Sequence, residues 1–265
     1  MRPPAALGPN FPAATSRANS AGRTANDPNR PLASGPRLHH PRVVQNEQPF
    51  HTIGARRYPG AIAGEREPLL QTLKSMCAAR PGYRFADLST LARFLVHGAA
   101  GTIARDTLGL RARPVRAVLF DKTPGANWSL AWHQDRTVAV RDRADAEGFG
   151  NWTVKQGIQH VEPPFELLSR MMTLRLHLDD VDEHNAPLLI APGSQRLGLI
   201  PEARISDVVA QCGSALCVAK AGDVWCYATP ILHASAASQS QGHRRVLQVD
   251  YSVDELPAPL RWLPT

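Results

Sequence analysis

The sequence of 265 residues predicts a mainly β domain, a sandwich or a barrel, that carries helices near its N-terminus. Two observations predict this class. From residue 115 onward, short apolar segments alternate with turn residues, as in all-β proteins. Before that point, apolar residues recur at helical spacing. No apolar run approaches the ~20 residues that cross a bilayer, so we expect no membrane partner.

The first 60 residues differ in composition from the rest. They contain ten of the 23 prolines and eight Arg, no Lys and two acidic residues. We interpret residues 1–60 as a disordered tail and residues 61–265 as one folded domain. Because the tail carries most of the formal net charge of +7, the domain is nearly neutral, which does not favour nucleic-acid binding.

The four cysteines match no zinc or redox motif, and no positively charged segment precedes an apolar leader. We therefore expect buried, reduced thiols in a cytoplasmic protein. Two helices are predicted before the strands, and both should pack on the outer sheet. The first spans residues 65–76, before a stop at Pro81-Gly82. The second begins with Asp87 or Ser89 as N-cap and continues to residue 103.

Seven strands are predicted, separated by turns such as Pro124-Gly125, Pro192-Gly193 and Gly222-Asp223. The long segment 141–166 between two of them is rich in charge and glycine, which predicts a loop that serves as a lid. The predicted strands are 115–121, 132–140, 171–178, 188–190, 216–218, 224–228 and 245–251.

A candidate metal site begins at His133 and Asp135. Residues i and i+2 of a strand project to the same side, so this imidazole and carboxylate point to one place. His233, late in the chain, could supply a third ligand. Two His and one carboxylate on one octahedral face form the site of non-haem Fe(II) oxygenases. The spacing alone is weak, because His177-Leu178-Asp179 shares it.

An arginine follows the third candidate ligand. Arg244 stands eleven residues after His233 at the start of a predicted strand. A guanidinium binds a carboxylate through two parallel hydrogen bonds, which suits a keto-acid co-substrate beside iron. Adjacent strand residues face opposite ways, so only one of Arg244 and Arg245 can enter the site, and the spacing favours Arg244.

At these motifs the chain resembles the phytanoyl-CoA dioxygenase family of Fe(II)/2-oxoglutarate-dependent oxygenases. The resemblance covers roughly residues 115–252, and two positions depart from the family pattern: Ala186 replaces a frequent Gly, and Gln195 a frequent His. The motifs are Trp132-His133-Gln134-Asp135, Asn185-Ala186-Pro187-Leu188, Ala191-Pro192-Gly193-Ser194-Gln195-Arg196, Ala221-Gly222-Asp223-Val224, and His233 followed by Arg244.

The resemblance implies a double-stranded β-helix, the cupin-like jelly roll, with the N-terminal helices outside it. It implies that His133, Asp135 and His233 hold Fe(II). It also implies that Arg244 binds the distal carboxylate of 2-oxoglutarate, with Ser235 as a helper. Since relatives that halogenate lack the carboxylate ligand, Asp135 favours hydroxylation, or a desaturation or cyclisation by the same oxidant, over halogenation. Such a reaction consumes O2 and releases succinate and CO2.

Further candidates surround this site. Arg175, on the polar face of strand 171–178, could pair with a ligand carboxylate or an acidic neighbour. We expect a small-molecule substrate; three other hypotheses stay open, namely a cupin that needs no keto acid, a silent metabolite-binding member of the fold, and nucleic-acid binding by the tail. The candidate substrate-binding residues are Asn127, Trp152, Lys155, Gln156 and His160, although Trp152 could simply pack on the barrel.

Overall fold

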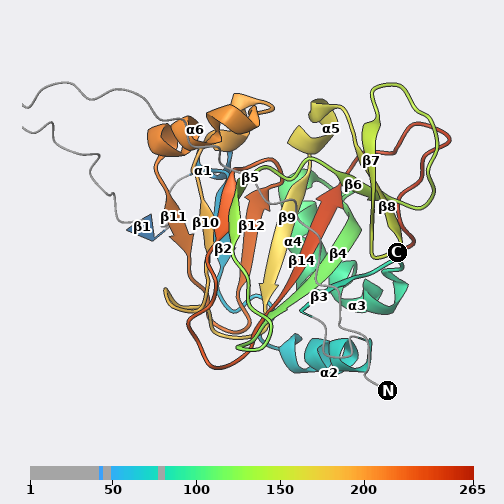
Figure 1. The fold of residues 1–265 in the computed structure, drawn as a ribbon. Helices are drawn as coiled ribbons and strands as arrows, with labels where there is room; N and C mark the ends of the chain where they lie inside the picture. Colours follow the sequence, from blue (N-terminus) through green and yellow to red (C-terminus); the bar gives the residue numbers. More distant parts are fainter. Residues whose placement is uncertain (1–41, 44–48, 77–80) are drawn as a thin grey trace, which may run out of the picture. The chain divides into compact units, whose positions relative to one another are not determined.

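The main sheet positions most of the polar side chains considered below. The computed structural model describes residues 42–43, 49–76 and 81–265. Within them, six antiparallel strands form a sheet in the order β2-β12-β9-β14-β4-β3 (Figure 1). The strands are β2 (Ala55–Tyr58), β3 (Gly82–Arg84), β4 (Arg113–Lys122), β9 (Met172–His177), β12 (Val224–Ala228) and β14 (Arg244–Ser252).

A second sheet packs against the inner face of the main sheet, in the order β1-β11-β10-β13-β5. Trp225 and Tyr227 of β12 share one apolar cluster with Leu188 and Ile190 of β10. The mainly β fold that the sequence predicts is therefore confirmed. The strands of this sheet are β1 (Arg42–Val43), β5 (Leu130–His133), β10 (Leu188–Ile190), β11 (Ala215–Cys217) and β13 (His233–Ser235).

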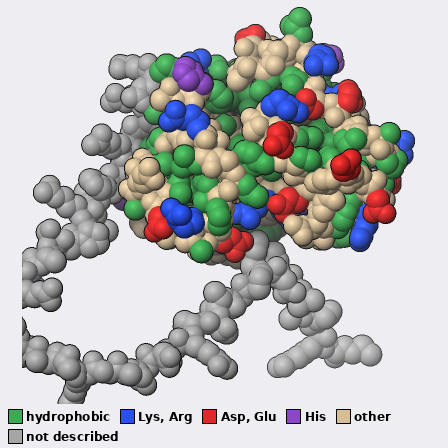
Figure 2. Space-filling view, turned by 90° about the horizontal axis from the view of Figure 1, so that it is seen from above, with side chains coloured by type: hydrophobic (Ala, Val, Ile, Leu, Met, Phe, Trp, Pro, Cys, Tyr) green, Lys and Arg blue, Asp and Glu red, His purple; other side chains and the backbone are tan. Residues whose placement is uncertain are grey.

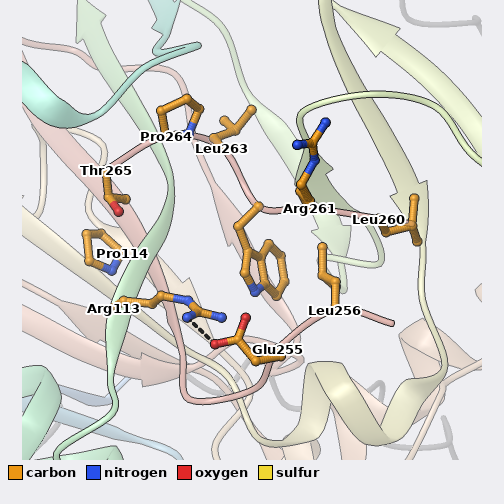
Figure 3. A pocket seen from close by; sticks show the side chains of 10 residues that line it. Arg113, Pro114, Glu255, Leu256, Leu260, Arg261, Leu263, Pro264 and Thr265 are labelled. Atoms are coloured by element: carbon orange, nitrogen blue, oxygen red, sulfur yellow. Dashed lines mark hydrogen bonds and ion pairs between the residues drawn. The ribbon is translucent and has the colours of Figure 1, made fainter. Parts of the chain in front are cut away.

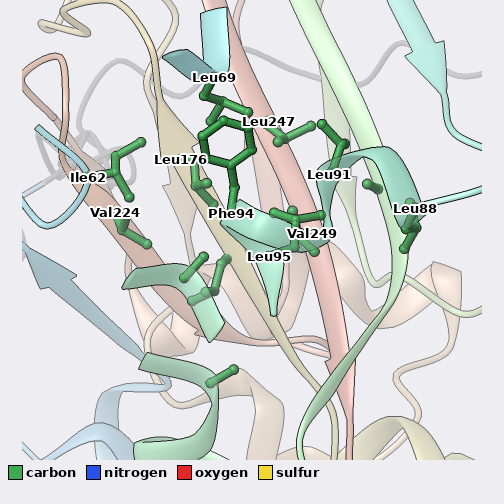
Figure 4. Close-up of a cluster of buried hydrophobic side chains, with 14 of the residues drawn as sticks. Ile62, Leu69, Leu88, Leu91, Phe94, Leu95, Leu176, Val224, Leu247 and Val249 are labelled. Atoms are coloured by element: carbon green, nitrogen blue, oxygen red, sulfur yellow. The ribbon is translucent and has the colours of Figure 1, made fainter. Parts of the chain in front are cut away.

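Helices cover the outer face of the main sheet, as expected. Their apolar side chains and the outward side chains of β9, β12 and β14 form one large core, in which Leu176, Leu95 and Val249 are fully buried (Figure 4). The expected helix at 65–76 is α2 (Arg66–Met76). The second expected helix is instead three pieces, η1 (Ser89–Leu91), α3 (Ala92–Leu95) and α4 (Ala99–Leu108).

Gly98 lies in the break between α3 and α4. A Cβ at this position would lie 2.5 Å from the Glu65 carboxylate and 2.7 Å from the Phe94 carbonyl. The same Glu65 carboxylate accepts a hydrogen bond from the first backbone N–H of α4, at Ala99 (2.9 Å). The break thus brings a carboxylate to the N-terminus of α4, where the helix dipole favours it.

The predicted strand 132–140 is two strands in two different sheets. β5 ends at His133 and pairs with β13, whereas β6 (Val138–Val140) pairs with β8. Gln134 holds the crossing: its amide donates to the carbonyls of Gly198 and Pro230 and accepts from the N–H of Ile200. Asp135 therefore lies just beyond the strand rather than within it.

The segment 141–166 is not a loop, which corrects the expectation of a lid loop. It contains the hairpin of β7 (Gly150–Lys155) and β8 (Ile158–Glu162), which joins β6 in a three-stranded sheet. The turn uses Gln156 and Gly157, both with positive φ, as a two-residue hairpin turn requires. The segment was expected to be a loop because the exposed outer side of this short hairpin is polar and rich in glycine, like a loop.

The remaining helices lie at the ends of strands. They are α1 (Phe50–Ile53), α5 (Phe165–Ser169), η2 (Ser194–Leu197), η3 (Glu202–Arg204) and α6 (Ile205–Cys212). No helix in residues 49–76 or 81–265 is long and apolar enough to span a membrane. On the face seen in Figure 2, basic and acidic side chains are interspersed.

The main sheet includes part of the segment assigned to the tail. β2 pairs with β12 over four residues, so the folded domain extends N-terminal of residue 61. Asp223, from the Ala221-Gly222-Asp223-Val224 motif, fixes this edge by accepting hydrogen bonds from the Arg57 side chain (2.9 Å) and from the N–H groups of Gly60 and Lys220 (2.7 Å each). The rest of the expected tail, residues 1–41 and 44–48, lies outside the described residues.

Cys217 and Cys226 are buried free thiols, and Cys212 is a half-buried one. Burial raises the pKa of Cys217 and of Cys226 to about 12, so both remain protonated at neutral pH. This environment fits the expectation of inert, reduced cysteines. Cys77 lies outside the described residues.

Candidate active site

The three predicted metal ligands come together at the end of β5. His133, the last residue of β5, lies directly opposite His233, the first residue of β13, and their ring centroids are 4.2 Å apart. Asp135 joins them from the chain just beyond β5, and one ligand atom of each residue lies within 4.8 Å of the others. The competing pair His177 and Asp179 belongs to no such group among the residues that the structure describes.

Both histidines have their Nδ1 atom held by a backbone carbonyl. His133 Nδ1 lies 2.8 Å from the carbonyl oxygen of Ala131, and His233 Nδ1 lies 3.0 Å from that of Ile231. An Nδ1–H donated to a carbonyl leaves the lone pair of Nε2 free for a metal. Burial, and then the neighbouring His133, lowers the pKa of His233 to about 4, so it is neutral at pH 7.

Arg116 forms ion pairs with two carboxylates, Asp135 and Asp250. Burial alone would raise the pKa of Asp135, but the positive charge of Arg116, followed by the electrostatic influence of His233 and His133, lowers it well below its usual range. Arg116 Nη2 lies 3.2 Å from Asp135 and its Nε lies 2.5 Å from Asp250. Thr173 donates a hydrogen bond to the same Asp250 (3.0 Å). The group therefore offers an ionised carboxylate at Asp135, a neutral imidazole at His233 and the second imidazole of His133.

Three buried cations occupy neighbouring strands on the inner face of the main sheet. Lys122 of β4 lies directly opposite Arg244 of β14, and Arg175 comes from β9 on the other side of β14. Only 1%, 2% and 5% of Lys122, Arg244 and Arg175, respectively, is exposed. None of the three forms an ion pair within the described parts of the chain. We refer to them as the buried cation group.

Neutral oxygens are the hydrogen-bond partners of this group. Arg244 Nη2 donates to the carbonyl of Ala186 (2.7 Å), and Arg175 Nη1 donates to the amide oxygen of Gln248 (2.9 Å). Lys122 Nζ donates to Ser235 Oγ (3.0 Å) and to the carbonyl of Ala236 (2.6 Å). These contacts orient the cations without neutralising them, and an uncompensated buried charge is costly.

The charges in the group oppose one another. Burial, and then Arg244 and Arg175, lowers the pKa of Lys122 to about 7, and burial followed by Arg175 lowers the pKa of Arg244. His177 is buried beside them with neither ring nitrogen hydrogen-bonded, and its pKa is lowered well below the usual value by burial and by the same two arginines. A bound anion would relieve this repulsion.

The two adjacent arginines face opposite ways. Arg244 points inward, whereas Arg245 forms an ion pair with Asp179, with Nη2 2.6 Å from one carboxylate oxygen and Nε 2.8 Å from the other. Asp179 also accepts the backbone N–H of Arg245 (2.8 Å). Arg245 is thus engaged outside the buried cation group.

The family of the chain follows from a sequence comparison. The family model for phytanoyl-CoA dioxygenase (PhyH) matches residues 85–246, which is more than half of the chain. The chain belongs to the phytanoyl-CoA dioxygenase family. A comparison with curated proteins found no match.

Solved structures share the fold of this phytanoyl-CoA dioxygenase family member. The apo form of EctD from S. alaskensis superimposes with a TM-score of 0.57 at 17% identity, over 84% of this chain and 86% of that one. SnoN, a non-heme alpha-ketoglutarate-dependent epimerase from nogalamycin biosynthesis, gives 0.56 at 16% identity (79% and 87%). HygX from Streptomyces hygroscopicus, with nickel, 2-oxoglutarate and hygromycin B bound, gives 0.53 at 17% identity (77% and 84%).

The departure from the family pattern at Ala186 has a structural consequence. Ala186 has a φ of 49°, in the left-handed region where glycine is favoured, which accounts for the frequent Gly. Its carbonyl is the acceptor for Arg244. Gln195, the other departure, lies against Gly54, where a Cβ would lie 2.4 Å from the glutamine side chain. Neither change removes one of the three candidate metal ligands, His133, Asp135 and His233, to which we refer as the metal-ligand group.

Three of the five candidate substrate residues make contacts that tie segments together. Asn127 donates to the carbonyl of Ser238 (2.6 Å) and accepts from its N–H (2.8 Å). Gln156 bonds the backbone of β3 at both ends, and Trp152 packs with the apolar cluster beneath the hairpin, 5.5 Å from the Arg143 guanidinium. The other two interact electrostatically with charged residues of the site, Lys155 with Asp135 and Arg116 and His160 with Arg116.

Sequence reasoning missed four charged residues of the site, namely Arg84, Arg116, Lys122 and Asp250. The alternation of side chains along β4 could have indicated two of them, because Arg116 and Lys122 lie on the same face of the strand as Val118 and Phe120. Arg244 and Asp250 likewise lie six positions apart in β14 and therefore share a face. The register that places these faces opposite one another comes only from the fold.

A cavity of about 260 Å³ lies elsewhere, between β4 and the C-terminal segment (Figure 3). Its lining includes Arg113, Glu255, Leu256 and Trp262, and the Arg113 guanidinium is paired with Glu255 within it (2.5 Å). A third charged residue of the lining, Arg261, pairs with Asp142 (3.3 Å), so all three charged side chains of this cavity already have ionic partners.

Proposed function

We propose that the protein is an Fe(II)- and 2-oxoglutarate-dependent dioxygenase that hydroxylates a small organic substrate. The observation that carries the proposal is the buried cation group, which reaches β13 through the hydrogen bond from Lys122 to Ser235 and so lies beside two imidazoles and an ionised carboxylate. A cupin-like metal site that used no keto acid would have no need of three buried cations without a carboxylate partner. A dicarboxylic keto acid supplies the missing charge.

The proposal gives the metal to His133, Asp135 and His233. Their donor set, two imidazole nitrogens and one carboxylate, fits Fe(II) and leaves three coordination positions for other ligands. Arg116 holds the Asp135 carboxylate in its ionised form and in one orientation. Asp135 serves as a ligand and not as a general base.

The proposal gives the distal carboxylate of 2-oxoglutarate to Arg244, with Ser235 and Arg175 as helpers. Lys122 joins them, because its ammonium bonds Ser235 Oγ and lies opposite Arg244. Two donor types suit one carboxylate: a guanidinium can bind both oxygens, while an ammonium acts as a compact point charge.

Iron, 2-oxoglutarate and O2 together supply an oxidant strong enough to hydroxylate a C–H bond, with succinate and CO2 as the other products. The residues of the chain would hold the metal and the co-substrate in position and balance their charges. The carboxylate ligand Asp135 supports hydroxylation over halogenation. SnoN, which has a related fold, is an epimerase by its name, so the fold alone does not fix the reaction outcome.

The test is anaerobic reconstitution with Fe(II) followed by titration with 2-oxoglutarate. We expect a metal-to-ligand charge-transfer band, and slow succinate formation once O2 is admitted without substrate. Arg244→Met should weaken 2-oxoglutarate binding at least tenfold, while the control Arg245→Gln should leave it unchanged. Iron-loaded protein that gave neither band nor succinate would overturn the proposal in favour of a keto-acid-independent or silent metal protein.

A further inference from the structure

A second set of unpaired cations lies apart from the buried cation group. In the register of the main sheet, Arg175, Gln248, Val118 and Arg84 form one row across β9, β14, β4 and β3. Arg84 is thus three strands away from Arg175, roughly 14 Å at the usual strand spacing. Its side chain shares the inner face with Val118, because Tyr83 beside it packs into the outer core.

The β7–β8 hairpin brings a lysine to the same place. Gln156, in its turn, accepts a hydrogen bond from the Arg84 N–H (2.9 Å) and donates one to the Gly82 carbonyl (2.8 Å), which fixes the hairpin on β3. The preceding residue is Lys155. Burial, and then Arg84 and Arg116, lowers the pKa of Lys155, and burial followed by Arg116 lowers the pKa of Arg84 to about 10.

Neither side chain has a partner of its own. In the part of the chain that the structure describes, the Arg84 guanidinium and the Lys155 ammonium donate no hydrogen bond and form no ion pair. Asp135 attracts both side chains and Asp250 attracts Arg84, but both carboxylates are already paired with Arg116. Two half-buried cations therefore stand beside the metal-ligand group with their charge uncompensated.

The neighbouring His160 adds no charge. It is 1% exposed, its Nδ1 contacts the Ile158 carbonyl, and its Nε2 has no hydrogen-bond partner. Burial lowers its pKa to about 4, and Arg116, Lys155 and Arg84 also lower it. His160 is therefore a buried, uncharged side chain near the two cations.

We propose that Arg84 and Lys155 form a binding subsite for an anionic group of the substrate, a carboxylate or a phosphate, next to Asp135. This inference rests on the proposed function, which assigns the co-substrate to the other cations. A partly desolvated guanidinium and ammonium bind an anionic group more strongly than exposed ones would. The substrate class is then a small anionic molecule whose reacting carbon lies near the metal ligands.

A comparison of stability with anion binding tests the subsite. Arg84→Gln and Lys155→Gln are compared with the exposed controls Arg111→Gln and Lys74→Gln by urea unfolding at low salt, with and without phosphate or acetate. Removal of one of two repelling, unpartnered cations should leave the midpoint unchanged or raise it. Each site variant should also weaken the apparent anion affinity at least tenfold, because bound anion stabilises the folded state by mass action.

The stronger of the two probes identifies the anionic group as phosphate or carboxylate. A lowered midpoint together with an unchanged anion effect would show that Arg84 and Lys155 are structural residues and would overturn the inference. So would an equal anion effect in the site variants and in the controls.

Calorimetric titration of nickel-loaded protein with 2-oxoglutarate separates this inference from the proposed function. The affinity of Arg84→Gln and Lys155→Gln for 2-oxoglutarate should stay within about twofold of the unsubstituted protein. A loss above tenfold would assign the two cations to the co-substrate and overturn the inference. If the unsubstituted protein does not bind 2-oxoglutarate, the proposed function fails, while the anion comparison without 2-oxoglutarate still decides the subsite.

Discussion

Replacing Lys122 with methionine should weaken the binding of 2-oxoglutarate without affecting a keto acid that lacks the distal carboxylate. Lys122 is 1% exposed and lies opposite Arg244, so its ammonium would meet the bound carboxylate away from water. A hydrogen bond between charged groups contributes about 1.5–3 kcal/mol. That corresponds to a loss in affinity of about tenfold to hundredfold.

The assay is calorimetric titration of nickel-loaded protein with 2-oxoglutarate and with 2-oxopentanoate, which has the same chain length and no distal carboxylate. Only the first should bind more weakly to Lys122→Met, and the exposed control Lys74→Met should change neither. Equal losses for both keto acids would refute the reasoning, because they would indicate general damage. An unchanged affinity for 2-oxoglutarate would refute it directly.

The affinity for 2-oxoglutarate, but not for 2-oxopentanoate, should depend on pH through Lys122. The pKa of Lys122 is lowered to about 7 in the free protein, by burial and by its two arginine neighbours. A bound carboxylate favours the charged amine and raises that pKa, so affinity is full below pH 7 and declines as pH rises through 7. Lys122→Met should abolish this decline, and its persistence in the variant would show that another group titrates.

Three further predictions concern the metal ligands, the pH dependence of stability and the core. His133→Ala and Asp135→Ala should lose bound Fe(II) on dialysis while His177→Ala retains it; the opposite pattern would move the metal site. His160 stays neutral when folded, with a pKa of about 4, but takes up a proton near pH 6.5 when unfolded, so stability falls as pH drops through that window, by roughly 3 kcal/mol at pH 4. His160→Asn should reduce this fall in urea unfolding at pH 7 and 4, and an unaltered fall would contradict the assignment. Leu176→Ala should cost about 2–5 kcal/mol of unfolding free energy, since the side chain is fully buried between sheet and helices, and a cost below about 1 kcal/mol would contradict that packing.

Local pattern predicted β4, β9, β10, β12 and β14 to within two residues at each end, but it missed β2 and β3 and failed where the chain changes its partner strand. β10 and β12 match their predicted ranges because apolar runs and flanking turns both depend on near neighbours in sequence. The split of 132–140 into β5 and β6 depends on which distant strands each half meets, and a single sequence carries no such information. The same holds for β7 and β8, whose polar outer side has no apolar pattern.

The candidate site shows a similar division between chemistry and geometry. Sequence analysis could select four of the candidate site residues, because their spacing and side-chain types together fit few kinds of metal and co-substrate site. They are His133, Asp135, His233 and Arg244. Lys122 could not be selected, since a lysine in a strand is usually exposed and only the register with Arg244 shows that this one is buried.

The distribution of charge also limits what the substrate can be. Around the described inner face, six cationic side chains face two carboxylates, although the folded domain as a whole is nearly neutral. A dianionic co-substrate offsets the cations near β9 and β14, but it would lie too far from β3 to offset Arg84 and Lys155 in the same way. A neutral substrate that displaced water from Arg84 and Lys155 would leave that second pair uncompensated. The requirement for a second anion therefore follows from where the positive charges stand and not from their total. The cations are: Arg84, Arg116, Lys122, Lys155, Arg175 and Arg244.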